Sequence, residues 1–595
     1  MALYHQHIVR LGGAVLTAAI LGACGGEAPP ASSLAPDKTP LAHVPTPPVT
    51  APPDLGPDLR SVLGHVPKDP LGVIPPADEN LIADAVRRFY EARRYEEAWY
   101  VDGRPRLEAY QAVERLAAAE EVGLRAADYR PERLHRYLEE ARDGFDLDRE
   151  EDRRRMAAID IELSHALAVY ALHRLRGRIH PERVNDAWYI EPRQRDLAAV
   201  LERAVDEDVA AAMEPLDPDH RGFDELLDAL ARYREIVAEG GWPRLPEGAV
   251  LEPGDEAPVS RLRPLLMRLA AEGYIEAVPD LRSPATADGE PTAIYDERIA
   301  TVVRLFQRRH GLEQDGKLGP NTLAALNVPA TERVEQIELN LERLRWLPRE
   351  PGVLHIEVNL PAYRLHVVRE GRRMMTMRVV IGKDDWITPV FSDTLETIVV
   401  NPYWYVPDTI AVADVLPKAR RDRSELAQYE FLSKDDGAAI DPSLVDPFDF
   451  DGEAPPYRLR QRPGSANPLG RLKFLFPNQH SIYLHDTPAD SLFEREDRAL
   501  SHGCVRIERP VDLAKLLLRG HPQWEPARLD EALASSERVV IDMHRAVPVV
   551  MLYWTVDATM EELPAFYGDP YGFDEQLAEE LAELPGGAAP VPQGG

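Results

Sequence analysis

The segment Leu354-His355-Ile356-Glu357-Val358-Asn359-Leu360 decides the fold class of the C-terminal half of this chain. Every second residue in it is apolar, and this period of two predicts a strand with one buried face. Many strands with few helices predict a mostly β domain over residues 352–557. Further strand candidates lie at 362–368, 374–381, 397–404, 473–476, 481–485, 539–543 and 547–556.

This β pattern is interrupted between about residues 406 and 470 by a stretch that is helical in its first part and acidic and proline-rich in its second. An insertion of this length inside a β domain is often a lid over a site. We therefore expect an inserted capping subdomain. A merely solvated acidic loop is an equally good interpretation of the acidic half alone.

Upstream of the β domain, the apolar residues recur at helical spacing. Leu81, Ile82, Val86 and Phe89 illustrate this pattern, which predicts a helical scaffold domain over residues 79–250. The expected fold class is therefore an α+β multidomain protein.

Residues 255–330 form a further unit. In the run from Phe306 to Leu323, Gly311 fits a helix end, Asp315-Gly316 fits a tight turn, and Pro320 fits the first turn of another helix. This run resembles the three-helix peptidoglycan-binding-like domain, which implies binding or docking to wall polymer. Some members of that family only act as scaffolds.

The N-terminus has the pattern of an export signal over residues 1–23, with a weakly basic start and a short apolar run. The segment Leu21-Gly22-Ala23-Cys24 resembles a bacterial lipobox, which implies lipidation of Cys24 and an outer-membrane anchor. A cleaved signal that leaves a soluble periplasmic protein is the alternative. Residues 24–78 are rich in proline and alanine and predict a disordered tether, and residues 578–595 predict a disordered tail.

Composition restricts the function. A formal net charge of −32 argues against a nucleic-acid partner, because such binding needs concentrated positive charge. The histidines His355, His366 and His480 lack metal-ligand spacing, and we expect neither a metal nor a cofactor. The chain has only two cysteines. If Cys24 carries lipid, Cys504 has no disulfide partner, which favours a catalytic role for this thiol.

The chemistry is expected around Cys504, in Ser501-His502-Gly503-Cys504-Val505-Arg506. A thiol needs a nearby base to become a nucleophile, and His485 at the end of the strand 481–485 is a candidate. Tyr483 shares a face of that strand with His485. Gly503 allows close backbone approach, and the N–H groups of Gly503 and Cys504 are candidates for an oxyanion hole.

Two motifs, Tyr483-Leu484-His485-Asp486-Thr487-Pro488 and the segment 501–506, resemble the active-site signature of L,D-transpeptidases. Matches at 401–407, at 462–470 and at 473–478 resemble the large YcbB-type murein enzymes of that family. The resemblance covers residues 79 to 575. It implies Cys504 as nucleophile, His485 as general acid/base and the Asp486 carbonyl as the group that orients its ring.

The resemblance also implies substrate contacts and a mechanism. Tyr483, His502 and Arg506 are expected to bind substrate, with Arg506 holding a carboxylate. A structural role without substrate contact for His502 and a purely structural, hydrogen-bonding role for Arg506 are equally open. Cys504 would attack the diamino-acid carbonyl of a tetrapeptide stem, D-alanine would leave, and a diamino-acid amine of a second stem would form a 3→3 cross-link.

Other acceptors share the same acyl-enzyme. Water would make the protein an L,D-carboxypeptidase, and a lysine amine would attach a lipoprotein to the wall. A non-catalytic wall-binding lipoprotein is the remaining alternative, and the intact pair of His485 and Cys504 argues against it.

Overall fold

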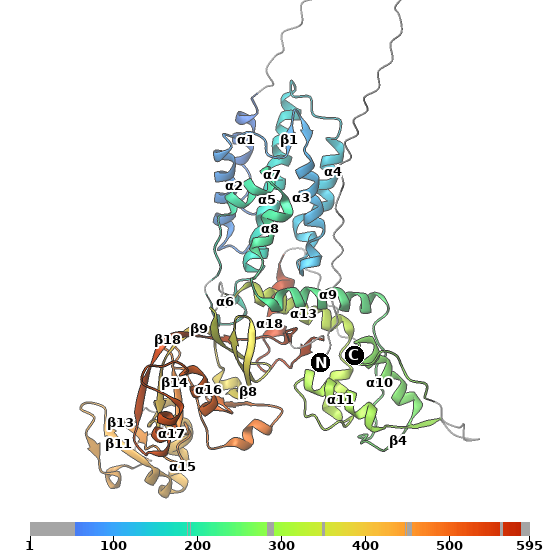
Figure 1. Cartoon of the computed structure of the whole chain (residues 1–595). Helices are drawn as coiled ribbons and strands as arrows, with labels where there is room; N and C mark the ends of the chain where they lie inside the picture. The colour runs from blue at the N-terminus through green and yellow to red at the C-terminus, as the bar shows by residue number, and fades with distance from the viewer. Residues whose placement is uncertain are drawn as a thin grey trace, which may run out of the picture. The chain divides into compact units, whose positions relative to one another are not determined.

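The computed structural model describes residues 54–584, except 187, 191, 282–290, 348–351, 447, 449–454 and 560–562. The expected export signal, Cys24 and the first part of the expected tether lie outside the described residues, as do residues 585–595 of the expected tail. The expected mixed α and β architecture is confirmed: helices dominate the N-terminal part and strands the C-terminal part (Figure 1).

The expectation of a disordered tether up to residue 78 is wrong from residue 54 onward. Helix α1 (Gly56–Leu63) begins with Pro57 in its first turn and packs against α5. The proline-rich composition hid scattered apolar residues that are spaced to reach one core. The buried apolar side chains of this segment are Leu55, Leu59, Leu71, Val73 and Ile74.

The helical region is organised around α5 (Glu150–Arg176), which is buried on all sides from Leu163 to Leu175. A helix that is apolar all round must be enclosed by others. The helices that pack against it are α1, α2 (Glu79–Ala92), α3 (Leu107–Ala117), α4 (Pro131–Glu140) and α7 (Leu197–Asp206) (Figure 1).

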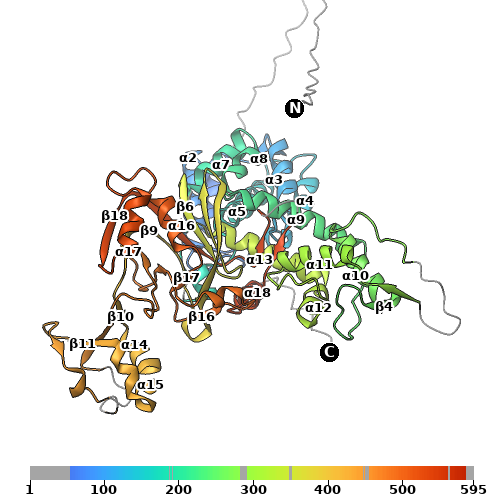
Figure 2. The ribbon, with the colours of Figure 1, turned by 60° about the horizontal axis from the view of Figure 1, so that its bottom comes forward.

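Two later helices connect this region to the β domain. Helix α9 (Arg221–Ala238) packs along α13 (Ala330–Arg345), and their apolar faces share a core with Val550 and Leu552 of strand β18 (Figure 2). The expected scaffold domain therefore does not end as an isolated unit at residue 250.

The unit predicted at 255–330 has the expected three helices, α10 (Val259–Ala271), α11 (Glu297–Arg309) and α12 (Pro320–Leu326). Strands β4 (Glu256–Pro258) and β5 (Thr292–Ile294) pair beside them.

Gln307 explains the sequence motif of this unit. Its amide nitrogen donates to Asp315 at 2.8 Å and to Thr322 at 3.0 Å, while its oxygen accepts the Gly316 N–H at 2.9 Å. The side chain of one helix thus closes the turn that leads to the next.

The β domain is one ten-stranded sheet whose main order is β14-β15-β17-β8-β7-β6-β18-β9-β3, with β16 (Ala499–Ser501) paired to β8. Strand β14 also pairs with β9, so the strands close on themselves. The strands are β6 (Leu354–Asn359), β7 (Arg364–Arg369), β8 (Arg372–Gly382), β9 (Val390–Val400), β14 (Leu472–Leu475), β15 (Leu484–His485), β17 (Val505–Ile507) and β18 (Val539–Leu552).

The last strand in that order comes from the helical region. β3 (Trp188–Tyr189) pairs in parallel with β9 through Trp188 opposite Val390 and Tyr189 opposite Phe391. The prediction of an entirely helical region at 79–250 missed this strand, because two residues are too few to show a period.

The insertion forms its own four-stranded sheet, in the order β10-β13-β11-β12. Figure 2 labels its strands β10 and β11. Its core is separate and contains Val406, Phe431 and Leu459. The strands are β10 (Trp404–Val406), β11 (Tyr429–Ser433), β12 (Ala439–Ile440) and β13 (Tyr457–Gln461). A capping role for this subdomain stays a prediction.

The β domain does not end at residue 557. Strands β19 (Val556–Asp557) and β20 (Ala565–Phe566) pair, and α18 (Phe573–Glu583) follows. The expectation of disorder from residue 578 is therefore wrong up to Leu584. Phe573, Leu577 and Leu584 are buried, and this sparse apolar stripe was masked by the surrounding glutamates and alanines.

No described helix combines the length and the apolar character that a membrane crossing requires.

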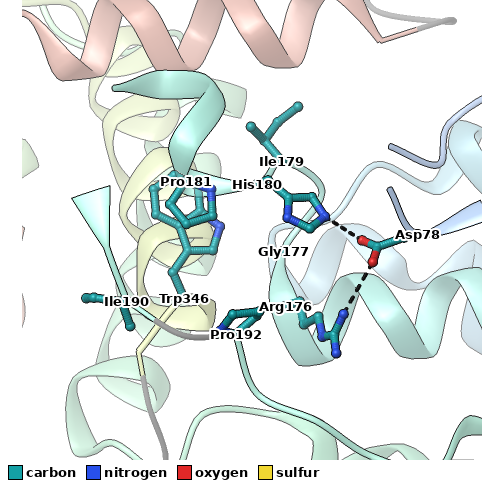
Figure 3. Close-up of a pocket in the computed structure, with 9 residues that line it drawn as sticks. All are labelled: Asp78, Arg176, Gly177, Ile179, His180, Pro181, Ile190, Pro192 and Trp346. Carbon is teal, nitrogen blue, oxygen red and sulfur yellow. Dashed lines mark hydrogen bonds and ion pairs between the residues drawn. The ribbon is translucent and has the colours of Figure 1, made fainter. Parts of the chain in front are cut away.

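Asp78 anchors the end of the N-terminal segment, at a small cavity beside α5. Figure 3 shows its carboxylate between His180 and Arg176. His180 Nε2 lies 2.7 Å and Arg176 Nη1 3.3 Å from the carboxylate oxygens. Ile179, Ile190 and Trp346 are among the apolar residues that line the cavity. The hydrogen bond to Asp78 raises the pKa of His180.

This contact predicts a pH-dependent contribution to stability. Because the pKa of His180 is raised in the folded state, the contribution is complete below the unfolded value of about 6.5 and disappears as the pH rises through the folded value. We expect Asp78→Asn to lower the melting temperature more at pH 6 than at pH 9, by the equivalent of about 1 kcal/mol. In a His180→Gln background the effect of Asp78→Asn should not change with pH.

Candidate active site

Three adjacent strands bring the predicted site residues together. In β14 and β15, Lys473 lies opposite His485, and in β15 and β17, His485 lies opposite Arg506. The same parallel register places Tyr483 beside Cys504, and the Val505 N–H donates to the Tyr483 carbonyl at 3.1 Å. Side chains at paired positions of neighbouring strands point to the same face. These five residues therefore share one face of the sheet.

The opposite face explains why this arrangement is fixed. Phe474, Leu484 and Val505 alternate with the polar residues and are fully buried in the core of the β domain. A shift of one residue in any of these strands would exchange the two faces and place charged groups in the core. The core thus determines where the thiol points.

The Cys504 thiol is half-buried. Its Sγ lies 3.7 Å from the Ser481 carbonyl oxygen. Burial raises the pKa of Cys504, and hydrogen bonds from Tyr483 together with the charges of Lys473 and Arg506 partly counter this rise. The resting thiol is therefore protonated at neutral pH and needs a base in order to react.

His485 has the environment of a neutral base. Burial is the main cause that lowers the pKa of His485, to about 3. Its Nδ1 lies 2.5 Å from the Asp486 carbonyl oxygen, the contact that the predicted orienting role requires. A neutral ring with the Nδ1 proton on that carbonyl keeps an unprotonated Nε2.

The Asp486 carboxylate serves a different purpose. It accepts the N–H groups of Arg471 at 2.7 Å and of Thr487 at 2.8 Å. Burial raises its pKa. The Asp486 backbone carbonyl thus orients His485, while the Asp486 side chain accepts backbone N–H groups at the end of β15.

The loop before the thiol is held by internal hydrogen bonds. Gly503 has φ +102°, a conformation that other residues rarely adopt. Its N–H donates to Ser501 Oγ at 3.1 Å, and Ser501 Oγ donates to the Cys504 carbonyl at 2.7 Å. The Gly503 N–H is therefore already engaged, and it would have to exchange this bond to act in an oxyanion hole.

Thr388 and Tyr571 also hold this loop, and the sequence analysis missed both. Buried Thr388 donates from Oγ1 to the Gly503 carbonyl at 2.7 Å and accepts the Gly382 N–H at 2.9 Å. The Tyr571 hydroxyl donates to the Gly382 carbonyl at 2.7 Å. Neither residue lies in a motif, and Thr388 is 115 residues from Gly503, so no local signal could have found them.

His502 and Arg506 have different surroundings. The His502 ring lies edge-on to Trp386 with centroids 5.2 Å apart, and burial lowers its pKa. The Nε of Arg506 is buried and has no hydrogen-bond partner among the described residues, and burial lowers the pKa of this guanidinium. Within the described part of the chain, no group of three His, Cys, Asp or Glu side chains is arranged to hold a metal ion.

Three segments match protein families. Residues 354–535 match the "L,D-transpeptidase catalytic domain", residues 84–230 the "Scaffold domain" and residues 265–326 the "Putative peptidoglycan binding domain". The resemblance drawn from the active-site motifs is thus confirmed.

A "Putative L,D-transpeptidase" of Haemophilus influenzae is 35% identical over 255 residues, which cover 42% of this chain and 50% of that protein. The match thus spans half the length of this curated relative.

Two solved structures show a distant similarity. The L,D-transpeptidase of Stackebrandtia nassauensis is 14% identical, with 52% of this chain and 97% of that chain covered and a TM-score of 0.19. The L,D-transpeptidase of Mycobacterium smegmatis is 11% identical, with 34% of this chain and 58% of that chain covered and a TM-score of 0.16. Scores this low carry no argument, and the assignment of the domain rests on the family matches.

The raised pKa of Cys504 can be measured directly. Because the thiolate is the reactive form, alkylation by iodoacetamide should be slow at pH 7 and should keep rising beyond pH 9. Mass spectrometry of the Cys504 peptide gives the rate at each pH. Lys473→Gln should move the profile to higher pH, because the Lys473 charge lowers the pKa of the thiol. A midpoint below 8 in the wild type would contradict the burial argument.

The role of Thr388 predicts a loss of stability. Thr388→Val keeps the shape but leaves the Gly503 carbonyl and the Gly382 N–H unpaired, which should lower the free energy of unfolding by about 1–3 kcal/mol. Thr397→Val, at a half-buried position of β9, is the matched control and should change it little. If the two substitutions lower the free energy of unfolding in urea equally, the hydrogen bonds of Thr388 do not stabilise this loop.

Proposed function

We propose that this chain, which carries an L,D-transpeptidase catalytic domain and a peptidoglycan-binding domain, forms 3→3 cross-links between peptidoglycan stem peptides. One observation carries the proposal: the Cys504 thiol and the neutral, backbone-oriented His485 imidazole share one face of the sheet in this domain. The donor would be a tetrapeptide stem and the acceptor the side-chain amine of a diamino acid in a second stem. No metal or cofactor takes part in this scheme.

Acylation would begin with proton transfer from Cys504 to Nε2 of His485. The sulfur attacks the carbonyl carbon of the diamino acid, and a tetrahedral oxyanion forms. As that intermediate collapses, the C–N bond to D-alanine breaks, and the His485 proton moves to the departing amine. The products are a thioester on Cys504 and free D-alanine.

Deacylation would follow the same path in reverse with a different amine. The acceptor amine attacks the thioester, and His485 takes the proton that the amine loses. The C–S bond breaks, and the proton returns from His485 to the thiolate. The free enzyme is regenerated and an amide joins the two stems.

The oxyanion of both steps needs hydrogen-bond donors. The Cys504 N–H is the first candidate, and the Gly503 N–H would join it by giving up its bond to Ser501 Oγ. Because that bond is long and neutral, its exchange for a bond to an anion is favourable.

The remaining parts support a wall location. The domain matched at 265–326 would hold wall polymer near the catalytic domain, and this match supports a location outside the cytoplasm. An anchor in the outer membrane through lipid on Cys24 is part of the proposal. His502 and Tyr483 would contact the donor peptide from beside the thiol.

The proposal predicts a covalent intermediate. Wild-type protein incubated with a disaccharide-tetrapeptide should gain the mass of the acyl group on Cys504, and Cys504→Ala should gain none. Intact-mass and peptide mass spectrometry detect the adduct. A dimer as the released product supports cross-linking, whereas tripeptide alone would mean that water is the acceptor. A Cys504→Ala variant that still forms product would disprove the nucleophile.

The base is tested separately. His485→Gln should lower the rate of adduct formation by roughly 10²–10⁴-fold, the range for loss of a general base. His544→Gln, an exposed histidine of the same domain, is the matched control and should leave the rate unchanged. An unchanged rate in His485→Gln would exclude the assigned role.

A further inference from the structure

Lys473 is a charged residue of the site face that lowers the pKa of Cys504 and to which no role in substrate binding has been assigned. It lies in β14 between Leu472 and Phe474, both of which are buried in the core, so its side chain points to the face of Cys504. Its Nζ sits 3.6 Å from the centroid of the Tyr483 ring. This contact holds the ammonium group beside the thiol without neutralising it.

Arg506 mirrors this position on the other side of His485. The strand order β14-β15-β17 places His485 between the two cations, with Lys473 opposite it in one pair and Arg506 opposite it in the other. Val505 and Ile507 are buried on either side of Arg506, so the guanidinium also points to the site face.

Among the described residues, neither cation has a carboxylate within ion-pair distance. By contrast, Arg378 lies 2.6 Å from Glu508 and Lys434 lies 2.7 Å from Asp408 in the same domain. The Asp486 carboxylate is bound to backbone N–H groups at the strand end.

The pKa shifts around the thiol agree with positive charges on Lys473 and Arg506 that no nearby negative charge compensates. The pKa of Lys473 is lowered to about 8, mainly by burial, while Cys504 acts to raise it and the Arg538 charge to lower it. The neighbouring thiol and imidazole are both neutral at pH 7, because burial raises the pKa of Cys504 and lowers that of His485. The face thus carries net positive charge in a partly desolvated place, and an anionic ligand would relieve that cost.

We propose that Lys473 completes a subsite that binds a carboxylate of the donor peptide next to the scissile bond. Arg506 has the carboxylate-binding role in it that the family resemblance implies, and Lys473 is the new member. This inference rests on the proposed function, and the group that the subsite would recognise is a carboxylate of the donor. A tetrapeptide donor offers two such groups, the terminal carboxylate of the leaving residue and the carboxylate on the diamino-acid side chain. Either would lie near the scissile bond, within the reach of a lysine or an arginine that flanks the nucleophile.

Such a subsite has a mechanistic consequence. A cation that binds the carboxylate of the donor fixes the scissile carbonyl relative to the Cys504 Sγ. This positioning raises the rate of acylation. It also selects against donors that lack the negative charge, because two half-buried cations would then stay unpaired. Lys473 is therefore a residue for specificity as well as for binding.

The test compares three donors with the full chain: the free tetrapeptide, the same peptide with a C-terminal amide, and the same peptide with the diamino-acid carboxylate amidated. The measured quantity is kcat/KM for adduct formation on Cys504. In the wild type, at least one amide donor should react about 10-fold to 100-fold more slowly than the free peptide. The slower donor identifies the carboxylate that is bound. This arm needs no variant and is independent of any folding defect.

Variants then assign the effect to Lys473. Lys473→Gln should lower kcat/KM for the free tetrapeptide about 10-fold to 100-fold more than for the sensitive amide donor. A small loss common to all donors is expected in addition, because the Lys473 charge lowers the pKa of Cys504. Lys473→Arg should restore part of the loss. Lys515→Gln is the matched control, because Lys515 pairs with Asp530 at 2.8 Å elsewhere in the domain, and it should behave as wild type.

The outcomes separate the two proposals. If the wild type forms no adduct with any donor, the proposed function fails and the subsite fails with it. If all three donors acylate Cys504 equally well, the function stands and the subsite is wrong. A Lys473→Gln loss of equal size on all donors would likewise overturn it, since Lys473 would then act on the thiol and not on the carboxylate.

Discussion

Alternation along three short strands is the constraint on which the site depends. Phe474, Leu484 and Val505 must lie in the core, so their neighbours Lys473, His485, Cys504 and Arg506 must lie on the other face. Because the strands pair in one register, the same requirement also fixes which groups are adjacent. The chemistry of the site is thus a consequence of the packing beneath it, and a slip in register would destroy both.

The rest of the fold stabilises the edges of this arrangement. The C-terminal segment beyond β18 supplies Tyr571, whose hydroxyl donates to the Gly382 carbonyl. Thr388 links the two glycines, because it accepts the Gly382 N–H and donates to the Gly503 carbonyl. Gly382 is required there, because a Cβ on it would lie 1.9 Å from the Trp386 carbonyl. The segment that follows residue 557 is therefore part of the catalytic unit, although the family match ends at residue 535.

Helix α13 connects the other parts to this unit. Its Glu342 accepts the N–H groups of Arg178 and of Ile179, the latter at 2.9 Å, and its Arg343 pairs with Asp574 of α18. Burial raises the pKa of Glu342. A buried carboxylate with two backbone donors is costly to disrupt, which makes this helix a structural link between the helical region and the β domain.

The sequence by itself determined the elements whose signals are local. Periodicity predicted the strands of the β domain, and the run from Phe306 to Leu323 indicated a three-helix domain by its resemblance to a known family. Two short motifs indicated Cys504 and His485 as the reacting pair. Composition misled at both ends, where Leu55, Leu59 and Leu584 reach the core despite proline-rich or polar surroundings. Only the tertiary structure decided which groups surround the thiol. Lys473, Thr388 and Tyr571 come from distant segments, and their contacts exist only after strand pairing and chain closure bring those segments together.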